Sequence, residues 1–395
     1  MNGFGTWAKR IGIGILAGLV GALVMTAVMA LLRIGPGISP PAELLGDRIV
    51  PTLDVRHFID LIVKYGGPNQ LKQIPIKASI AGQLGVGVLF GLIYAFIVKE
   101  GKGQSLFRFG RLSLSRRGFV YISAVILVLW TATMIYLWPV LWSNYRGLPP
   151  TPARIVTMIG TFVSYASYGV TLLLAYHLLA GPFPIRETTP NDDRVRMGRR
   201  AVLVGGVGVV AAASGVGLIR ALYNRGAFSY DGTRYHPADA DYIVPVDRFY
   251  TVTKNLVDPV VEKPLWRLKI GGLVDHPHTY SFDDLTARTA VKQDTTLECI
   301  SNGVGDGLMS NATWTGVPMR ELLNDAGLKT GIKRVLLRAV DGYTDTIPLD
   351  KAMEPTTLVA YEMNGQPLPH HHGYPVRVIV PGRFGEKNVK WVTAI

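Results

Sequence analysis

The sequence is poor in charge, in cysteine and, over its first half, in acidic residues. Charged residues make up 17% of the 395 positions, against about 25% in a typical soluble domain. A single cysteine, Cys299, cannot form a disulfide within the chain, which excludes a disulfide-stapled fold. The apolar fraction of 48% excludes a disordered or collagen-like chain. The length allows two or three domains.

The positive charge lies in the hydrophobic half of the chain. Residues 1–220 carry a formal balance of +14, whereas residues 221–395 carry −1. A nucleic-acid-binding domain gathers its cations on one folded face, but here they flank apolar runs, as in the loops of membrane proteins. The sequence therefore argues against a nucleic-acid partner and predicts association with a lipid bilayer.

Five apolar runs are long enough to cross a bilayer as helices, which takes about 20 residues. All five lack acidic and basic side chains, and they cover residues 11–32, 78–98, 119–142, 155–180 and 201–219. Basic residues precede the first run and fill the loops after the second and the fourth. The positive-inside rule then predicts a multi-pass protein of the cell (inner) membrane with a cytoplasmic N-terminus, and a C-terminal half on the periplasmic side.

The fifth run is rich in glycine and follows the adjacent pair Arg199 and Arg200. This resembles a twin-arginine export signal, which serves proteins exported after folding; an ordinary basic flank before an anchor is the alternative. No cleavage site stands out, so we expect the segment to remain as an anchor. The expected organisation is a four-helix membrane region (1–180), a cytoplasmic basic linker (181–200), a fifth span (201–220), a tether (221–245) and a soluble domain (246–395).

Two further features of the first half bear on function. Residues 55–65 (VRHFIDLIVKY) have helical apolar spacing and predict an amphipathic helix, either on the outer membrane surface or packed as a cap on the bundle. His177 is the one histidine inside a predicted span. We expect an interfacial or hydrogen-bonded role for it, and contact with a quinone stays open.

The second half predicts a mixed α+β domain. Short strands are expected at 266–270, 334–340, 358–362 and 376–380, and short helices at 281–285 and 318–326. Ser281 is a candidate helix cap, and Gly327 is a helix stop. Strands and helices do not alternate in a regular βαβ repeat, which argues against a doubly wound sheet. The predicted fold is thus an all-α membrane bundle followed by this α+β domain.

Several long segments of the second half carry a family resemblance. They are DRFYTVTKN (247–255), WRLKIGGLVDHP (266–277), LECISNGVGDGLMSNATWTGVPM (297–319), DGYTDTIPLDKAM (341–353) and VAYEMNGQPLPHHHGYPVRVIVPGRFGEKNVKW (359–391). Residues 246–395 resemble the molybdopterin-binding domain of the sulfite oxidase family. The resemblance implies a molybdenum–molybdopterin cofactor with Cys299 as the protein ligand to the metal. Taken alone, a lone cysteine is most often buried packing.

The resemblance also implies the remaining site residues. His372 and Arg377 in HGYPVR, Lys387 and Lys390 in GEKNVKW, and Asn255 are expected to bind the cofactor, whose phosphate requires fixed cations and donors. Tyr343 is expected beside the metal, where it would act in catalysis with Cys299, and Asp345 is a second polar candidate. The alternative for Tyr343 is a turn aromatic after Asp341 and Gly342.

One departure from the family bears on the substrate. Sulfite oxidases carry arginines after the metal-ligating cysteine, whereas residues 300–304 read ISNGV, so the clamp for a divalent anion is missing. A neutral sulfoxide, on a small molecule or on a protein, fits better, as for the periplasmic methionine sulfoxide reductase branch. The sequence thus predicts a membrane-anchored oxidoreductase that transfers an oxygen atom on a small substrate of the sulfoxide or oxyanion type and draws on a quinone or cytochrome. The alternative is a non-catalytic cofactor-binding or sensing module on a membrane anchor.

Overall fold

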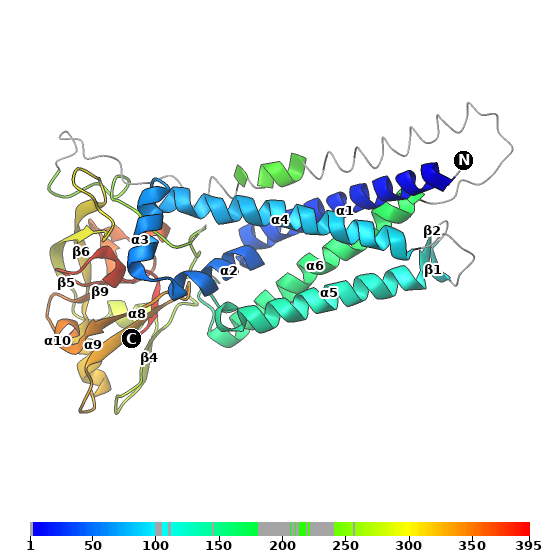
Figure 1. The fold of residues 1–395 in the computed structure, drawn as a ribbon. Coiled ribbons are helices and arrows are strands. Elements are labelled where there is room, and N and C mark those ends of the chain that lie inside the picture. The colour runs from blue at the N-terminus through cyan, green and yellow to red at the C-terminus, as the bar shows by residue number, and fades with distance from the viewer. Residues whose placement is uncertain are drawn as a thin grey trace.

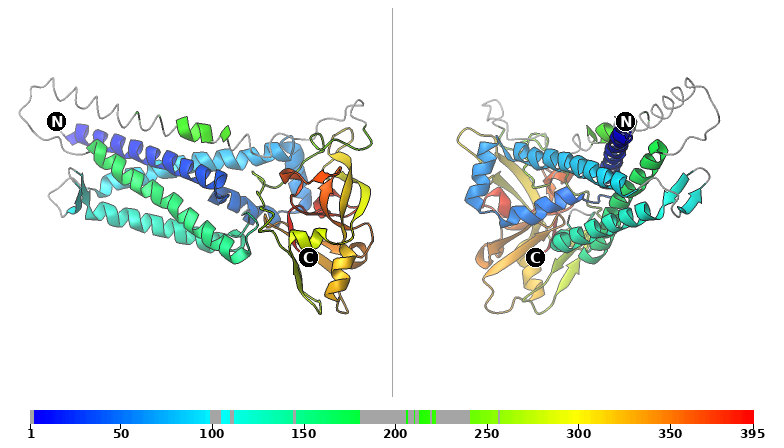
Figure 2. Two further views of the ribbon diagram at one scale, coloured as in Figure 1. Left: turned by 180° about the vertical axis from the view of Figure 1, so that it is seen from behind. Right: turned by 45° about the vertical axis from the view of Figure 1, so that its right-hand side comes forward.

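The computed structural model describes residues 3–98, 105–109, 112–143, 146–180, 241–255 and 257–395, with a few residues between 206 and 221. A long bundle of helices carries a sheet domain at one end (Figure 1). Two further directions show the same arrangement, with the N-terminus at the end of the bundle far from the domain (Figure 2).

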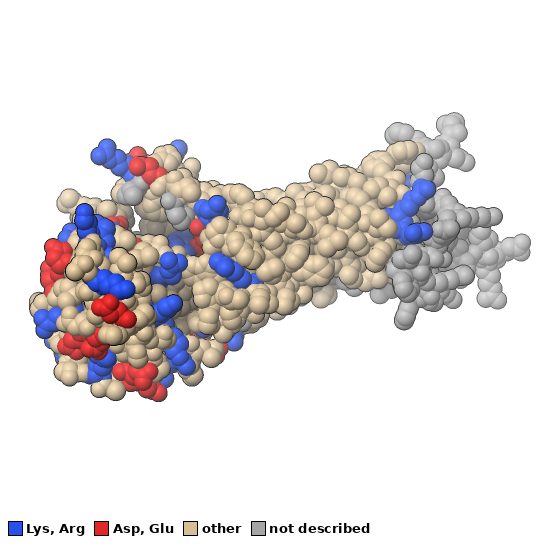
Figure 3. Space-filling model, turned by 90° about the horizontal axis from the view of Figure 1, so that it is seen from below, with Lys and Arg blue, Asp and Glu red and all other residues tan. Residues whose placement is uncertain are grey.

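Four long helices form the bundle, and each coincides with most of one predicted apolar run, although the third helix ends five residues before the predicted end of its run. They are α1 (Gly3–Ile34), α4 (Pro68–Ile97), α5 (Arg116–Leu137) and α6 (Pro150–Ala180). All four are long and apolar enough to cross a membrane. Their outer faces expose large apolar side chains, such as Val128 (66% exposed) and Ile135 (74%), and the middle of the bundle shows no charge in Figure 3. The basic linker, and most of the fifth predicted span and of the tether, lie outside the described residues.

Glycines allow α1 and α4 to pack with their backbones in contact. Gly14 and Gly18 of α1 face Gly87 and Gly91 of α4, with a spacing of four residues on each helix. A Cβ atom on Gly91 would lie 2.3 Å from the carbonyl oxygen of Gly14 and 2.7 Å from the Cα of Gly18. Small residues at this spacing are typical of close helix pairs in membranes. The hydroxyl of Tyr168 on α6 donates to the Gly87 carbonyl over 2.7 Å, which fixes the third helix on this pair.

We therefore expect Gly91→Val to destabilise the bundle by about 1–3 kcal/mol or more, because the added side chain meets backbone that cannot move aside. Thermal unfolding of the full chain in detergent measures the effect. Gly85→Val is the matched control, since it lies on the same helix and a Cβ there meets nothing within 4 Å. Equal melting temperatures for the two variants would contradict this account of the α1–α4 contact.

Shorter elements gather at the domain end of the bundle. They are α2 (Pro41–Ile49), the 3-10 turn η1 (Val50–Thr52), α3 (Val55–Lys64) and the 3-10 turn η2 (Trp138–Val140). Helix α3 confirms the predicted helix at 55–65, and the Asp54 side chain caps it by accepting from the Arg56 amide over 2.9 Å. The opposite end of the bundle carries the hairpin of β1 (Ser105–Phe109) and β2 (Leu112–Ser115), as Figure 1 shows.

The domain is built on two five-stranded sheets. One has the order β10-β9-β6-β5 with β11 also on β9, and the other has the order β4-β3-β12-β7-β8. Among the described strand pairs, β3 with β12 is parallel and the rest are antiparallel. The strands are β3 (Leu268–Ile270), β4 (His278–Tyr280), β5 (Val291–Glu298), β6 (Met309–Pro318), β7 (Arg334–Ala339), β8 (Thr344–Pro348), β9 (Leu358–Met363), β10 (Gln366–Pro367), β11 (Arg377–Ile379) and β12 (Val392–Ala394).

Short helices complete this mixed domain, as the sequence predicts. They are α8 (Phe282–Thr286), α9 (Met319–Ala326), α10 (Leu349–Ala352) and the 3-10 turns η4 (His370–His372) and η5 (Gly385–Lys387). Ser281 caps α8 in a reciprocal pair with Asp284, and Gly327 ends α9 with φ +67°. The side chains of Trp266, Trp314 and Trp391 are fully buried in the domain core.

Candidate functional site

Cys299 lies at the base of the loop that joins β5 to β6. Its amide donates to the Leu308 carbonyl over 2.9 Å, directly after the last register pair of the hairpin. Asn302 closes the loop, since its side chain accepts from the Leu308 amide (3.0 Å) and donates to Glu298 (3.1 Å). The partly exposed thiol lies 3.1 Å from the Ser301 hydroxyl. The hairpin therefore presents the thiol at a fixed place on the domain surface.

Tyr250 is a buried neighbour of this thiol that the sequence analysis did not single out. Its ring stacks on Phe249 with centroids 5.5 Å apart. A Cβ built on Gly385 would lie 2.6 Å from the Tyr250 hydroxyl and 3.3 Å from the Glu298 carbonyl, so the phenol lies between η5 and the end of β5. Burial raises the pKa of Tyr250, and nearby Cys299 raises it further. The phenol is therefore a neutral hydrogen-bond donor.

Arg377 provides a buried cation on β11. Its guanidinium donates to the carbonyls of His372 (3.0 Å) and Asn388 (2.9 Å) and lies over the ring of Trp314. Its Nε atom is buried with no hydrogen-bond partner among the described residues. Burial lowers the pKa of Arg377 to about 10, so the side chain remains charged at neutral pH. Burial also lowers the pKa of His372, which is therefore a neutral imidazole.

Lys390 places a second cation nearby. Its ammonium donates to the carbonyls of Val252 (3.2 Å) and His371 (3.0 Å). Gly373, at φ +111°, lets the two basic residues approach, because a Cβ there would lie 3.0 Å from Arg377 and 3.2 Å from Lys390. Burial lowers the pKa of Lys390 to about 8.

A pH dependence of anion binding follows from this lowered pKa. A bound phosphate favours the charged ammonium of Lys390. Above about pH 8 the ammonium of the empty site has lost its proton, so phosphate binding must then take up a proton. We expect the affinity of the cofactor-free chain for a phosphate monoester to fall about tenfold between roughly pH 7.5 and 9.5. The free energy of unfolding of the empty chain changes in the opposite direction. It rises over that pH window, because Lys390 holds more protons in the unfolded chain than in the folded one.

Calorimetric titration at the two pH values measures the change in affinity. Lys390→Arg is the control, because a guanidinium stays charged throughout and should flatten the profile. A wild-type affinity that does not change with pH would show that Lys390 is not part of the anion site.

Tyr343 and Lys387 meet on a carboxylate. The Tyr343 hydroxyl donates to Asp345 and lies 3.2 Å from both Asp345 Oδ2 and the Glu386 carbonyl. The Lys387 ammonium lies 2.6 Å from Asp345 Oδ1. The contacts of these three residues do not join Tyr343 to Cys299, so the expected place of Tyr343 beside the metal stays a prediction. The charge of Lys387 is compensated by Asp345, unlike that of Arg377.

Asn255 is buried (1% exposed) between the site and the bundle. Its amide donates to Asp341 Oδ2 over 2.9 Å, whereas its Oδ1 has no hydrogen-bond partner among the described residues. Asp341 Oδ1 in turn accepts from the amide of Tyr343 over 3.0 Å. Asn255 is thus connected to the turn that carries Tyr343, and it still has one acceptor to offer.

These residues fit an anionic cofactor with many hydrogen-bonding groups. Buried polar atoms are normally satisfied, yet Arg377 Nε and Asn255 Oδ1 are not. A phosphate and a pterin ring would supply the missing acceptor and donor. The described residues contain no group of three or more His, Cys, Asp or Glu side chains that could hold a metal ion. The sequence resemblance implies that a metal here would be held by Cys299 together with the cofactor.

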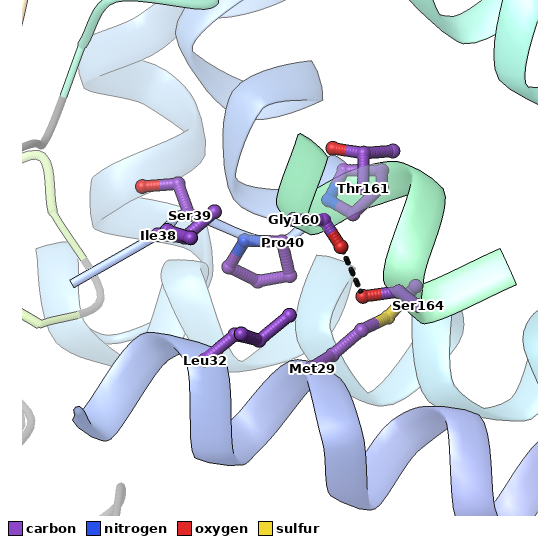
Figure 4. A pocket seen from close by; sticks show the side chains of 9 residues that line it. Met29, Leu32, Ile38, Ser39, Pro40, Gly160, Thr161 and Ser164 are labelled. Atoms are coloured by element: carbon purple, nitrogen blue, oxygen red, sulfur yellow. Dashed lines mark hydrogen bonds between the residues drawn. The ribbon is translucent and has the colours of Figure 1, made fainter. Parts of the chain in front are cut away.

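The bundle holds a separate small cavity between the end of α1 and α6 (Figure 4). Ser39, Thr161 and Ser164 lie among its lining residues, and the Ser164 hydroxyl donates to the Gly160 carbonyl over 2.9 Å. Its volume of about 10 Å³ has room for about one water molecule. It is too small for a quinone ring.

Comparison with known proteins bears on the domain alone. The family described as oxidoreductase molybdopterin binding domain matches residues 255–395. The oxidoreductase YuiH of Bacillus subtilis is 35% identical over 33% of this chain and 64% of its own length. Human mitochondrial sulfite oxidase is 34% identical over 38% of this chain and 32% of its own length.

A solved structure, the sulfane dehydrogenase SoxCD of Paracoccus pantotrophus, is similar at 29% identity over 38% of this chain and 42% of that chain, with a TM-score of 0.37. This chain thus spans less than two thirds of each of these relatives. On the family match and the similarity to sulfite oxidases, residues 255–395 are a molybdopterin-binding oxidoreductase domain of the sulfite oxidase family.

Proposed function

We propose that this chain is a membrane-anchored molybdenum-cofactor oxidoreductase that transfers an oxygen atom on the extracytoplasmic side. One observation carries the proposal. The Cys299 side chain and the Tyr250 ring pack in one core cluster with Trp314, and the buried Arg377 guanidinium lies over the Trp314 ring, so a soft metal ligand, a phenol donor and a buried cation share one region of the domain.

Each side chain then has a defined task. When bound, the cofactor supplies a metal that changes oxidation state as an oxygen atom is transferred. The Cys299 thiolate is the soft ligand that such a metal prefers. Arg377 and Lys390 bind the phosphate end, and Asn255 Oδ1 accepts a hydrogen bond. Tyr250 donates to a substrate oxygen, for which its raised pKa keeps the proton in place.

The loop after Cys299 supports a neutral substrate, such as a sulfoxide. Residues 300–307 contain no cation and one carboxylate, Asp306. The exposed side chains of this loop include Ile300 and Val304. Sulfite, a divalent anion, would meet an apolar loop and a like charge there, which costs binding energy.

The position of the basic residues supports the proposed orientation. Arg10, Arg116 and Arg117 begin candidate spans or flank them at the end of the bundle far from the domain, and Figure 3 shows Lys and Arg there. Positive residues tend to remain on the cytoplasmic side, which supports an extracytoplasmic domain.

The electron donor, a quinone or a cytochrome, is proposed to reach the domain directly. His177 lies near the far end of α6, about 40 Å from the start of that helix at Pro150. Its ring nitrogen lies 3.2 Å from the Tyr94 hydroxyl, which is the hydrogen-bonded role that the sequence favours. A relay from His177 would have to cross the length of the bundle, and the described residues offer no metal-binding group along it.

The full chain, purified in detergent from a host that makes the cofactor, tests the proposal. Elemental mass spectrometry should find close to one molybdenum per chain, and reduced dye should be oxidised with a sulfoxide but not with nitrate. Sulfite oxidation at a higher kcat/KM would overturn the substrate assignment. A folded chain without molybdenum, or a loaded one that turns over neither sulfoxides, N-oxides, nitrate nor sulfite, would favour the non-catalytic module.

A further inference from the structure

The domain is attached to the bundle through charged side chains at the end of the four helices. Arg33 at the end of α1 pairs with Glu43 of α2 over 2.9 Å, with both side chains 4% exposed, and also donates to the Val257 carbonyl of the domain. Lys254 of the domain pairs with Asp47 of α2 over 2.5 Å. Arg146 and Glu262 form a third pair over 3.0 Å, which is about 40% exposed on each side.

The Lys254–Asp47 pair is the centre of a buried cluster. The second oxygen of Asp47 accepts from the Ser143 hydroxyl over 2.9 Å. The turn at Gly342 packs on the same serine, since a Cβ there would lie 3.0 Å from Ser143 Cβ. Burial alone would lower the pKa of Lys254, but the carboxylates of Asp341 and Asp47 outweigh burial and raise it. Lys254 is therefore a charged ammonium that pairs with Asp47 of the bundle and is attracted electrostatically by Asp341 of the domain.

This cluster continues into the cofactor residues. Lys254 precedes Asn255, whose carbonyl accepts from Lys72 of α4 over 3.3 Å. The amide of Asn255 donates to Asp341, and Asp341 orders the amide of Tyr343. The bundle thus contacts the chain segments on both sides of the Asn255–Asp341 bond.

We propose that Asp47, on the short helix α2 of the membrane region, is a positioning residue for the cofactor site. Its carboxylate draws the Lys254 ammonium away from Asp341, which leaves Asp341 Oδ2 to Asn255. Without that carboxylate, the ammonium turns to Asp341 and displaces the Asn255 amide, so Asn255 Oδ1 no longer has a fixed direction. The role of Asn255 in this inference rests on the proposed function.

The test is Asp47→Asn in the full chain, which keeps the shape and removes the charge. We expect molybdenum per chain to fall about tenfold, the size usual for residues that orient a ligand, and the Mo(V) resonance of the remaining loaded enzyme to shift. Amide hydrogen exchange should accelerate in 251–258 and 339–345. Asp47→Asn with Lys254→Gln should restore slow exchange and most of the metal, because no buried charge is left unpaired.

Glu262→Gln is the matched control, since it removes a carboxylate of the same junction that does not contact the Asn255–Asp341 bond. If Asp47→Asn behaves like Glu262→Gln, or if the double variant is as impaired as the single one, the proposal is wrong. If Asp47→Asn fails to fold, the double variant decides, because it removes both charges: slow exchange at 339–345 with most of the metal retained supports the proposal, and fast exchange with lost metal refutes it. A wild type without molybdenum would refute the proposed function, whereas the exchange comparison would still test the positioning role.

Discussion

Cys299→Ser should abolish oxygen-atom transfer while the domain stays folded. The fold should tolerate the change, because Cys299 is partly exposed at the edge of a core cluster, lies beside the polar Ser301 hydroxyl and is replaced by a side chain of similar size. Residues that merely orient a metal ligand cost about 10–100-fold when removed, so loss of the ligand itself should cost more than about 100-fold in kcat. The hairpin loop should survive, because Asn302 and backbone bonds hold it.

Activity, molybdenum content and the Mo(V) spectrum should be measured together. The cofactor also binds through its pterin and phosphate, so we expect metal to remain and the spectrum to change. Ser301→Ala is the control, since it removes the thiol's neighbour and leaves the ligand. A Cys299→Ser enzyme with wild-type turnover and an unchanged spectrum would refute the ligand assignment.

Arg377→Met should empty the site. In the proposed site, Arg377 pairs with the phosphate of the cofactor. Removing one partner of a buried charge pair costs about 3–5 kcal/mol, which corresponds to about a 100-fold or greater loss of cofactor affinity. The change also leaves the carbonyls of His372 and Asn388 without their donor, so the variant should also melt at a lower temperature. Arg377→Lys keeps the charge but cannot span both carbonyls, and should give an intermediate loss.

Molybdenum per folded chain and the melting temperature together separate these effects. Arg383→Met serves as control, because Arg383 lies in the following loop and is exposed. A variant that melts early but retains full cofactor would show that Arg377 supports the fold and does not bind the phosphate.

The sequence predicts the bundle well because the physical signal is local. Length and absence of charge identify the four helices, and capping chemistry at Ser281 fixes the start of α8. The site residues are another matter, because they depend on contacts between distant segments. Tyr250 approaches Cys299 only when the segment before β3 packs against the loop between β5 and β6. Asp47 and Lys254 are separated by 207 residues in sequence, so no local pattern indicates their pairing.

Tyr343 shows a signal that was available in the sequence. Tyr343 directly precedes β8 and Asp345 is the second residue of that strand; residues two apart in extended backbone share one face, so the two side chains are placed to bond to each other. The structure shows that bond, which an alternation of polar side chains in the sequence could have indicated. The expected place of Tyr343 beside the metal stays a prediction.

The junction between bundle and domain has two layers that differ in their response to salt. Arg146 and Glu262 are exposed to solvent, where ions at physiological strength screen charges over about 8 Å. The Arg33–Glu43 pair is shielded from water, with side chains 4% exposed, and Asp47 is almost as well covered. High ionic strength should therefore loosen the rim of the junction and leave its centre intact. Salt washes that remove peripheral proteins from membranes would then leave the buried contacts between this domain and the helices intact, and the segment at Asn255 would keep its position.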